Sequence, residues 1–126
     1  FTQEDVRDVQ LAKGAIRAAI DLFLQETGTS PESIDTIVLA GGFGYSLEPE
    51  SLETIGMIPP GMADKVHFAG NTSRLGCVRL LLDVGERRRI EERMSQVEHI
   101  SLAERVEFME QYVENMRFPD LVHHDC

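Results

Sequence analysis

The sequence predicts an α/β fold: a short parallel sheet, covered by helices in three layers and incomplete within this chain. Three observations predict it. A long apolar helical pattern opens the chain, two short apolar runs each end at a glycine, and helical patterns outnumber the strands. Apolar parallel strands normally lie inside a larger sheet with helices on both faces. Two or three short strands cannot bury so many helix faces, so we expect further strands from upstream sequence, with self-association as a homodimer the alternative.

The first predicted element is a long helix over residues 3–26. Thr2 and Asp5 have the spacing of a capping box, and Gly28 is placed to end the helix. Apolar residues recur at spacings near 3.6 and leave little polar surface after Leu11, so we expect burial on more than one side. Lys13 interrupts this surface, and we expect its long side chain to reach solvent.

Two apolar runs, residues 34–40 and 66–69, are predicted as buried strands because each is short and ends at a glycine. Pro49 is suited to the first turn of a short helix over residues 49–55. Three residues after the second run are each competent N-caps for the helix that follows: Asn71, Thr72 and Ser73.

The second half of the chain is predicted to be mostly helical. The expected helices cover residues 71–84, 86–95 and 102–116, and a third short strand covers residues 97–102. In the first of these helices we expect inward-facing apolar residues and, beside them, a buried cysteine: Leu75, Val78, Leu81, Leu82 and Cys77. Gly85 is expected to separate the first two helices, and Pro119 to close the last amphipathic helix, which carries Val106, Met109 and Val113.

Composition excludes several classes of function. The formal net charge is −10, from 22 acidic and 12 basic residues, which argues against a nucleic-acid or anionic-membrane surface. Cys77 and Cys126 are far apart and no CxxC pattern occurs, so we expect no iron–sulfur or structural zinc site within this chain. No apolar run approaches the ~20 residues of a spanning helix. A cytoplasmic protein with a disordered terminus over residues 120–126 is the simplest interpretation, and we expect no metal site in its His123–Cys126 run.

Two glycine-rich junctions carry most of the chemistry. The first follows the strand over residues 34–40 and contains Gly41, Gly42 and Gly44; the second spans residues 70–76. Ligands of open α/β sheets bind beyond the carboxyl ends of the strands, where glycines let the backbone approach a ligand. By physics alone, both a ligand-binding role and a purely conformational role stay open for these turns.

The same residues carry a family resemblance. The run VLAGGFG, followed by IGMIP and AGNTSRLG, resembles the carboxy-terminal ATPase subdomain of the reductive activators of corrinoid proteins. The opening TQEDVRDVQLAKGAIRAAI and the closing NMRFP are similar to that family too, so the resemblance spans about residues 1–119. These activators belong to the superfamily of acetate and sugar kinases, heat-shock chaperones and actin. The resemblance therefore implies an actin-like, ribonuclease H-like second lobe.

The resemblance also implies a site and a function. Gly41, Gly42, Phe43 and Gly44 would line the adenosine site of ATP, and the neighbouring junction would support the same pocket through Gly70, Asn71 and Gly76. ATP hydrolysis, with Mg²⁺ held mainly by upstream residues, would accompany electron delivery from an iron–sulfur cluster outside this chain. The electron would restore cobalt(I) in a corrinoid protein of methyl transfer. We expect no catalytic residue within the chain itself.

Two other functions stay open. The first is a non-catalytic module that keeps the fold for dimerisation or partner docking. The second is a lobe of another superfamily member, such as a sugar kinase or a dehydratase activator.

Overall fold

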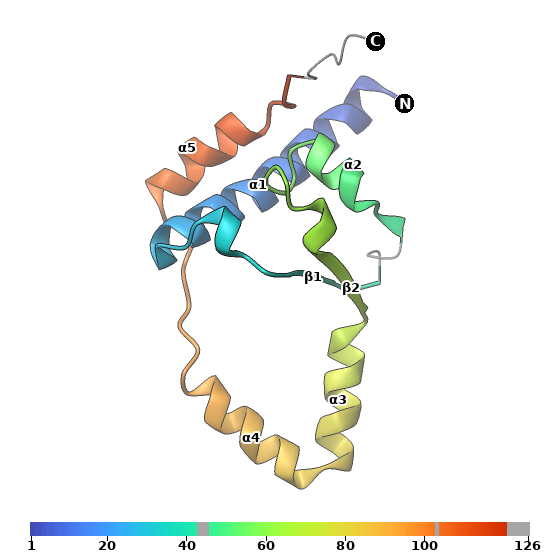
Figure 1. Cartoon of the computed structure of the whole chain (residues 1–126), viewed down its shortest axis with the longest axis vertical. Helices are drawn as coiled ribbons and strands as arrows, with labels where there is room; N and C mark the ends of the chain where they lie inside the picture. The colour runs from blue at the N-terminus through green and yellow to red at the C-terminus, as the bar shows by residue number, and fades with distance from the viewer. Residues whose placement is uncertain (43–45, 103, 121–126) are drawn as a thin grey trace.

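Two parallel strands form a small sheet at the centre of the chain (Figure 1). The computed structural model describes residues 1–42, 46–102 and 104–120. The strands are β1 (Ile37–Ala40) and β2 (Val66–Gly70). The α-helices are α1 (Gln3–Thr27), α2 (Pro49–Thr54), α3 (Thr72–Leu82), α4 (Val84–Met94) and α5 (Val106–Asn115). Among the described residues the two strands pair only with each other, so the sheet is open, as the sequence predicts.

Helix α1 begins and ends at the predicted caps. The Thr2 hydroxyl accepts a hydrogen bond from the backbone N–H of Asp5 (3.2 Å), and the Asp5 carboxylate accepts one from the N–H of Thr2 (2.7 Å). Gly28 ends the helix in the left-handed region, with φ at 61°. These local interactions satisfy backbone groups that a helix end otherwise leaves unpaired, which is why they could be predicted from sequence.

One face of the sheet is covered by an apolar core. Leu52, Ile58, Met62 and Val66 are buried together, and partly buried apolar residues pack around them: Ile20, Ile34, Ile37, Leu39, Met57 and Phe68. This core joins α1, α2, the loop after α2 and the inner face of both strands. On the other face, Val38 and His67 are exposed. The sheet is therefore covered on one side only within the described residues.

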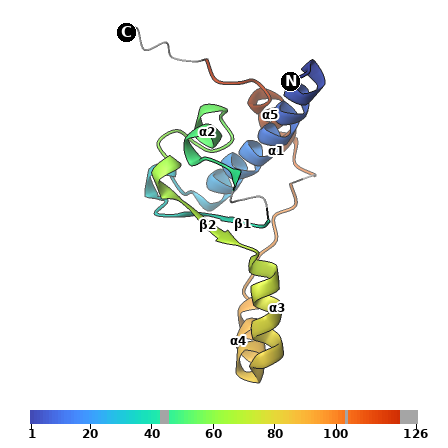
Figure 2. The ribbon, with the colours of Figure 1, turned by 90° about the vertical axis from the view of Figure 1, so that its right-hand side faces the viewer.

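Helix α5 lies antiparallel along α1 (Figures 1 and 2). Polar side chains form part of the contact between the two helices. Asn115 donates to the Asp21 carboxylate (3.2 Å), and Arg105 forms an ion pair with Glu26 (2.5 Å). The apolar stripe of the predicted amphipathic helix faces solvent, since Val106, Met109 and Val113 are all exposed.

Helices α3 and α4 form an arm that projects from the rest of the chain (Figure 2). They contact each other, and neither helix contains a buried residue. The predicted inward-facing leucines are therefore exposed: Leu81 and Leu82 retain 79% and 82% of their accessible surface. Cys77, predicted to be buried, is exposed as well.

The connections around the arm correct two predictions. The break between α3 and α4 is at Asp83, whose carboxylate accepts hydrogen bonds from the N–H groups of Gly85 (2.7 Å) and Glu86 (3.3 Å). Gly85 lies in the first turn of α4 and does not separate the helices. Residues 97–102 form no strand. Ile100 and Leu102 instead line an apolar hollow of about 740 Å³ beside α1 and β1.

Candidate functional site

The two predicted glycine junctions meet at the carboxyl ends of the strands. Ala40 pairs with Gly70 in the parallel register, and the N–H of Gly41 donates to the carbonyl oxygen of Gly70 (2.8 Å). The register shifts between Leu39 and Ala40, so β2 contains one additional residue at this point. Gly41 and Gly70 both have positive φ, 118° and 64°, which other residues adopt at a cost. The glycines are therefore required by the backbone of this turn.

No described residue fills the space beside the first junction. A Cβ atom built on Gly41 or on Gly42 would meet no atom of the described residues within 4 Å. Gly42 is exposed and does not have a positive φ, so its lack of a side chain is not explained by strain. This position leaves room for a ligand to approach the backbone. Phe43 and Gly44, which sequence also placed in the site, lie outside the described residues.

Asn71 connects the second junction to α3. Its side-chain oxygen accepts a hydrogen bond from the N–H of Arg74 (2.9 Å), as expected of an N-cap. The N–H groups of Thr72 and Ser73 precede the first intrahelical bond and have no helical partner. Backbone N–H groups at a helix start favour anions, because they add to the positive end of the helix dipole.

Gly76 is not brought to the same place. It lies within α3, about 7 Å along the helix axis from Asn71 at 1.5 Å per residue. A Cβ atom on it would also meet nothing within 4 Å. The structure thus brings together Gly41, Gly42, Gly70 and Asn71, and it places Gly76 on the arm.

Lys13 is a position whose role sequence reasoning missed. Only 1% of its surface is accessible. Its ammonium group donates a hydrogen bond to the carbonyl oxygen of Arg117 and lies 5.3 Å from the centre of the Phe118 ring. Burial lowers the pKa of Lys13, and the positive charge of nearby Arg17 lowers it further. Its place within an apolar helix face was the available signal, but the expected snorkelling to solvent is wrong.

Glu53 is a second structural anchor that sequence reasoning missed. Its carboxylate accepts hydrogen bonds from three successive N–H groups, those of Gly61 (2.8 Å), Met62 (3.1 Å) and Ala63 (2.9 Å). These donors, that of Gly61 foremost, hold the pKa of Glu53 below its usual value. The loop between α2 and β2 is thereby fixed at the rim of the apolar core.

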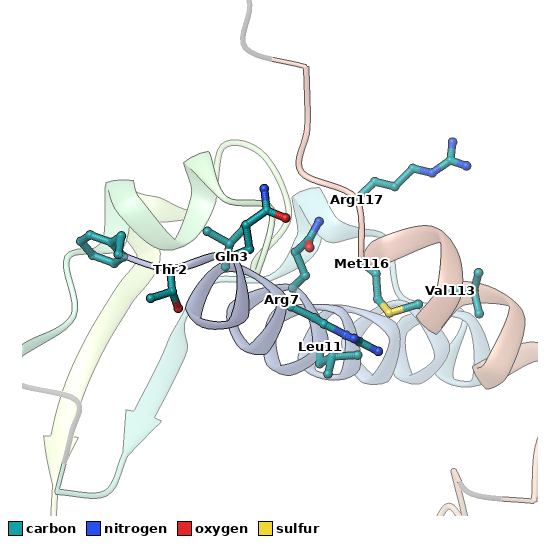
Figure 3. Close-up of a pocket in the computed structure, with 10 residues that line it drawn as sticks. Thr2, Gln3, Arg7, Leu11, Val113, Met116 and Arg117 are labelled. Carbon is teal, nitrogen blue, oxygen red and sulfur yellow. The ribbon is translucent and has the colours of Figure 1, made fainter.

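A surface groove lies between the start of α1 and the end of α5 (Figure 3). We call it the α1–α5 groove. It has a volume of about 890 Å³, and its lining includes Val6, Arg7, Leu11, Val113, Met116 and Arg117. Figure 3 shows Arg7 lying along α1 near Leu11, and Arg117 extending away from the helix pair. This groove and the glycine junctions are separate parts of the surface.

No group of three or more His, Cys, Asp or Glu side chains comes together as metal ligands in the part of the chain that the structure describes. None of its helices is both long and apolar enough to cross a membrane.

Comparison with known proteins gives a consistent family. Residues 1–124 match the family described as the C-terminal domain of RACo, the ASKHA domain. The corrinoid activation enzyme RamQ of Eubacterium limosum is 34% identical over 122 residues, 97% of this chain and 21% of that protein. The [Co(II) methylated amine-specific corrinoid protein] reductase of Methanosarcina barkeri is 32% identical over 83 residues, 66% of this chain and 15% of that protein.

A solved structure agrees with these sequence matches. A reductive activator for corrinoid, iron-sulfur protein superposes with a TM-score of 0.86 and 28% sequence identity, over 94% of this chain and 19% of that one. The actin-like fold expected from the glycine motifs is confirmed by this likeness. The chain spans about a fifth of the length of RamQ and of the solved reductive activator.

Proposed function

Because the chain belongs to the family of the C-terminal ASKHA domain of RACo, we propose that it is the nucleotide-binding lobe of a corrinoid reductive activator. The named relatives are corrinoid activation enzymes and reductases, which supports a role in corrinoid reactivation. In this proposal the lobe is one part of a longer cytoplasmic protein. Its partner is a corrinoid protein, and its iron–sulfur cluster is bound outside residues 1–126.

The observation that carries the nucleotide proposal is the open space at the joined strand ends. Gly41 and Gly42 leave room for the adenosine, and the N–H groups that begin α3 provide neutral donors beside it. The residues present therefore fit part of a nucleotide site. A bound ATP would supply the free energy of hydrolysis for a conformational change that accompanies electron transfer. The groups that hold Mg²⁺ and the phosphates would come from another part of the protein.

Electron transfer itself needs no catalytic side chain from this chain. A cluster bound outside residues 1–126 would supply one electron to the cobalt(II) of the corrinoid protein, which would become cobalt(I). The lobe would contribute by binding nucleotide and by changing its position relative to the other lobe. Residues 1–126 alone are accordingly expected to show no ATP hydrolysis above background.

Gly42→Val in the longer protein is the sharpest test. Gly42 has no positive φ, and a Cβ there would meet none of the described residues within 4 Å, so the substitution adds bulk to this space with little backbone strain. We expect ATP and ADP affinity, measured by calorimetry, to fall at least about tenfold, since about 1.4 kcal/mol of lost binding suffices. Gly41→Val is less informative because φ at Gly41 is 118°.

The matched control is Ala12→Val, which adds similar bulk at an exposed position of α1. Its nucleotide affinity should equal that of the unaltered protein. Gly76→Ala then tests whether the arm takes part in the pocket, as the sequence resemblance implies. Unchanged nucleotide binding by Gly42→Val, or no nucleotide binding by the longer protein, would contradict the proposal.

A second function is favoured by one observation, the uncovered apolar residues of the α3–α4 arm. They fit a module used for dimerisation or partner docking. We favour coverage by the remainder of the same polypeptide, because the chain spans only a fifth of its relatives. Sedimentation of the longer protein separates the two: a monomer supports the activator lobe, whereas a dimer that Leu81→Gln dissociates supports the docking module.

A further inference from the structure

The charge of the α1–α5 groove is opposite to the charge of the chain. Among the described residues that line it, only Arg7 and Arg117 have charged side chains, although acidic residues exceed basic ones by ten in the whole sequence. Neither arginine forms an ion pair with another described residue, unlike Arg17, Arg89 and Arg105. The groove therefore contains two arginines that have no ion-pair partner among the described residues.

One wall of the groove is held in place from beneath. Lys13 binds the carbonyl oxygen of Arg117, and a Cβ on Gly14 would lie 3.1 Å from Cγ of Met116. This close approach of α1 to the end of α5 fixes Met116 and the backbone of Arg117. A preformed surface loses less conformational entropy on binding, so this part of the groove is suited to recognition.

Apolar side chains line the floor and continue beyond it. Val6, Leu11 and Val113 are exposed in the groove. Val106 and Met109 extend the same row along α5, where Glu110 and Glu114 flank it, so the two arginines lie at the groove end of the row only. Residues 106, 109 and 113 follow the spacing of one helix face. A row of this kind with arginines beside it accepts an amphipathic helix, which buries apolar residues while its acidic residues meet the arginines.

The composition of the groove distinguishes it from the α3–α4 arm. The groove combines apolar residues with arginine and methionine, which are enriched in protein–protein interfaces. The arm exposes Leu81 and Leu82 almost completely, as is typical of a surface that is buried in a larger assembly. We therefore expect the arm to be covered permanently and the groove to bind a partner reversibly.

We propose that the α1–α5 groove docks an acidic amphipathic helix of the corrinoid protein partner, with Arg7 and Arg117 meeting its carboxylates. This inference rests on the proposed function. The apolar row contributes burial, and the two arginines set the orientation and the rate of association, because complementary charges act mainly on encounter and register.

The test measures binding of the longer protein to the purified corrinoid protein by biolayer interferometry. The variants are Arg7→Glu, Arg117→Glu and both together, and the matched control is Arg88→Glu on the exposed face of α4. We expect the double variant to bind at least about tenfold more weakly, mainly through slower association, and the control to stay within about twofold. Raising salt should weaken the unaltered protein more than the double variant. Equal melting temperatures would show that the variants are folded.

The outcomes separate the two proposals. If the unaltered protein does not bind the corrinoid protein, both the partner and the groove proposal are wrong. If it binds and the arginine variants bind equally well, only the groove proposal is overturned. The groove proposal also fails if hydrogen exchange shows residues 3–11 and 109–117 protected to the same extent with and without the partner, since a segment of the same polypeptide would then cover them.

Discussion

Lys13 on α1 donates a hydrogen bond from its ammonium group to the carbonyl oxygen of Arg117, which lies 104 residues later in the chain. The contact joins the first helix to the segment that follows the last helix. Two glycines make room for this segment, since Gly14 faces Met116 and Gly56 faces Pro119. The hydrogen bond of Lys13 thus holds residues 116–119 against the rest of the chain, and the two glycines allow them to pack closely.

Replacing Lys13 by Met should loosen this segment. The change keeps much of the apolar packing but removes the donor to Arg117 and the cation above Phe118, so we expect a loss of about 1–3 kcal/mol in the free energy of unfolding. Trypsin should cleave faster after Arg117, as measured by mass spectrometry during limited digestion. Lys65→Met is the control, because Lys65 also donates to backbone carbonyls, those of Glu32 and Ile34, away from this segment. Equal cleavage in both variants would show that Lys13 does not hold it.

Gly56 and Gly61 offer a matched pair of glycine substitutions. Their φ angles are 76° and 74°, so alanine meets nearly the same backbone strain at both positions, about 1 kcal/mol or more. At Gly56 the new Cβ would also lie 2.9 Å from Cγ of Pro119, whereas at Gly61 it meets nothing within 4 Å. We expect Gly56→Ala to cost about 1–3 kcal/mol more than Gly61→Ala in urea unfolding. Equal losses would mean that Pro119 moves away freely.

Glu53 should make stability depend on pH in the acid range. Its pKa in the folded protein is below the usual 4.5, so its contribution is complete above that value and is lost as pH falls through the folded pKa. Glu53→Gln should be less stable by about 1–3 kcal/mol at pH 7, with the difference shrinking toward pH 3. Urea unfolding across this range measures it. Glu50→Gln on the same helix is the control, and a difference independent of pH would contradict the assignment.

Replacing an exposed leucine of the α3–α4 arm should affect stability much less than replacing a buried leucine of α1. Leu81 is 79% exposed, so Leu81→Gln in the isolated chain should change stability by less than about 0.5 kcal/mol and reduce light scattering at high concentration. Leu22, with 1% exposure, is the buried control, and Leu22→Ala should cost about 2–5 kcal/mol. In the longer protein Leu81→Gln should lower the melting temperature as well. No effect there would show that the arm stays uncovered.

The elements that sequence predicted well are those set by neighbours in the chain. The Thr2–Asp5 capping box, the left-handed Gly28 and the Asn71 cap depend on residues within a few positions, and all three are confirmed. The turns at the strand ends could also be predicted from their glycines, because a turn with positive φ has few alternatives to glycine. The role of these glycines in nucleotide binding stays a prediction.

The errors concern what each apolar face contacts. A helical repeat of leucine or valine shows that a face is apolar, but it does not identify the partner, and neither Leu81 nor Val113 is covered within the described residues. Residues 97–102 have the composition of a strand, yet none of the described strands pairs with them. Lys13 was misjudged because its acceptor lies 104 residues away, beyond any local pattern.

The junction of β2 with α3 has a mechanical consequence. Gly70 and Asn71 lie at one end of α3, and this helix of 11 residues extends about 16 Å from the sheet. A rotation of about 10° at Gly70 would therefore move the far end of α3 by about 3 Å, by the geometry of that helix length. A change in the backbone angles at Gly70 would therefore displace the far end of the apolar arm much more than the end that lies beside Gly42.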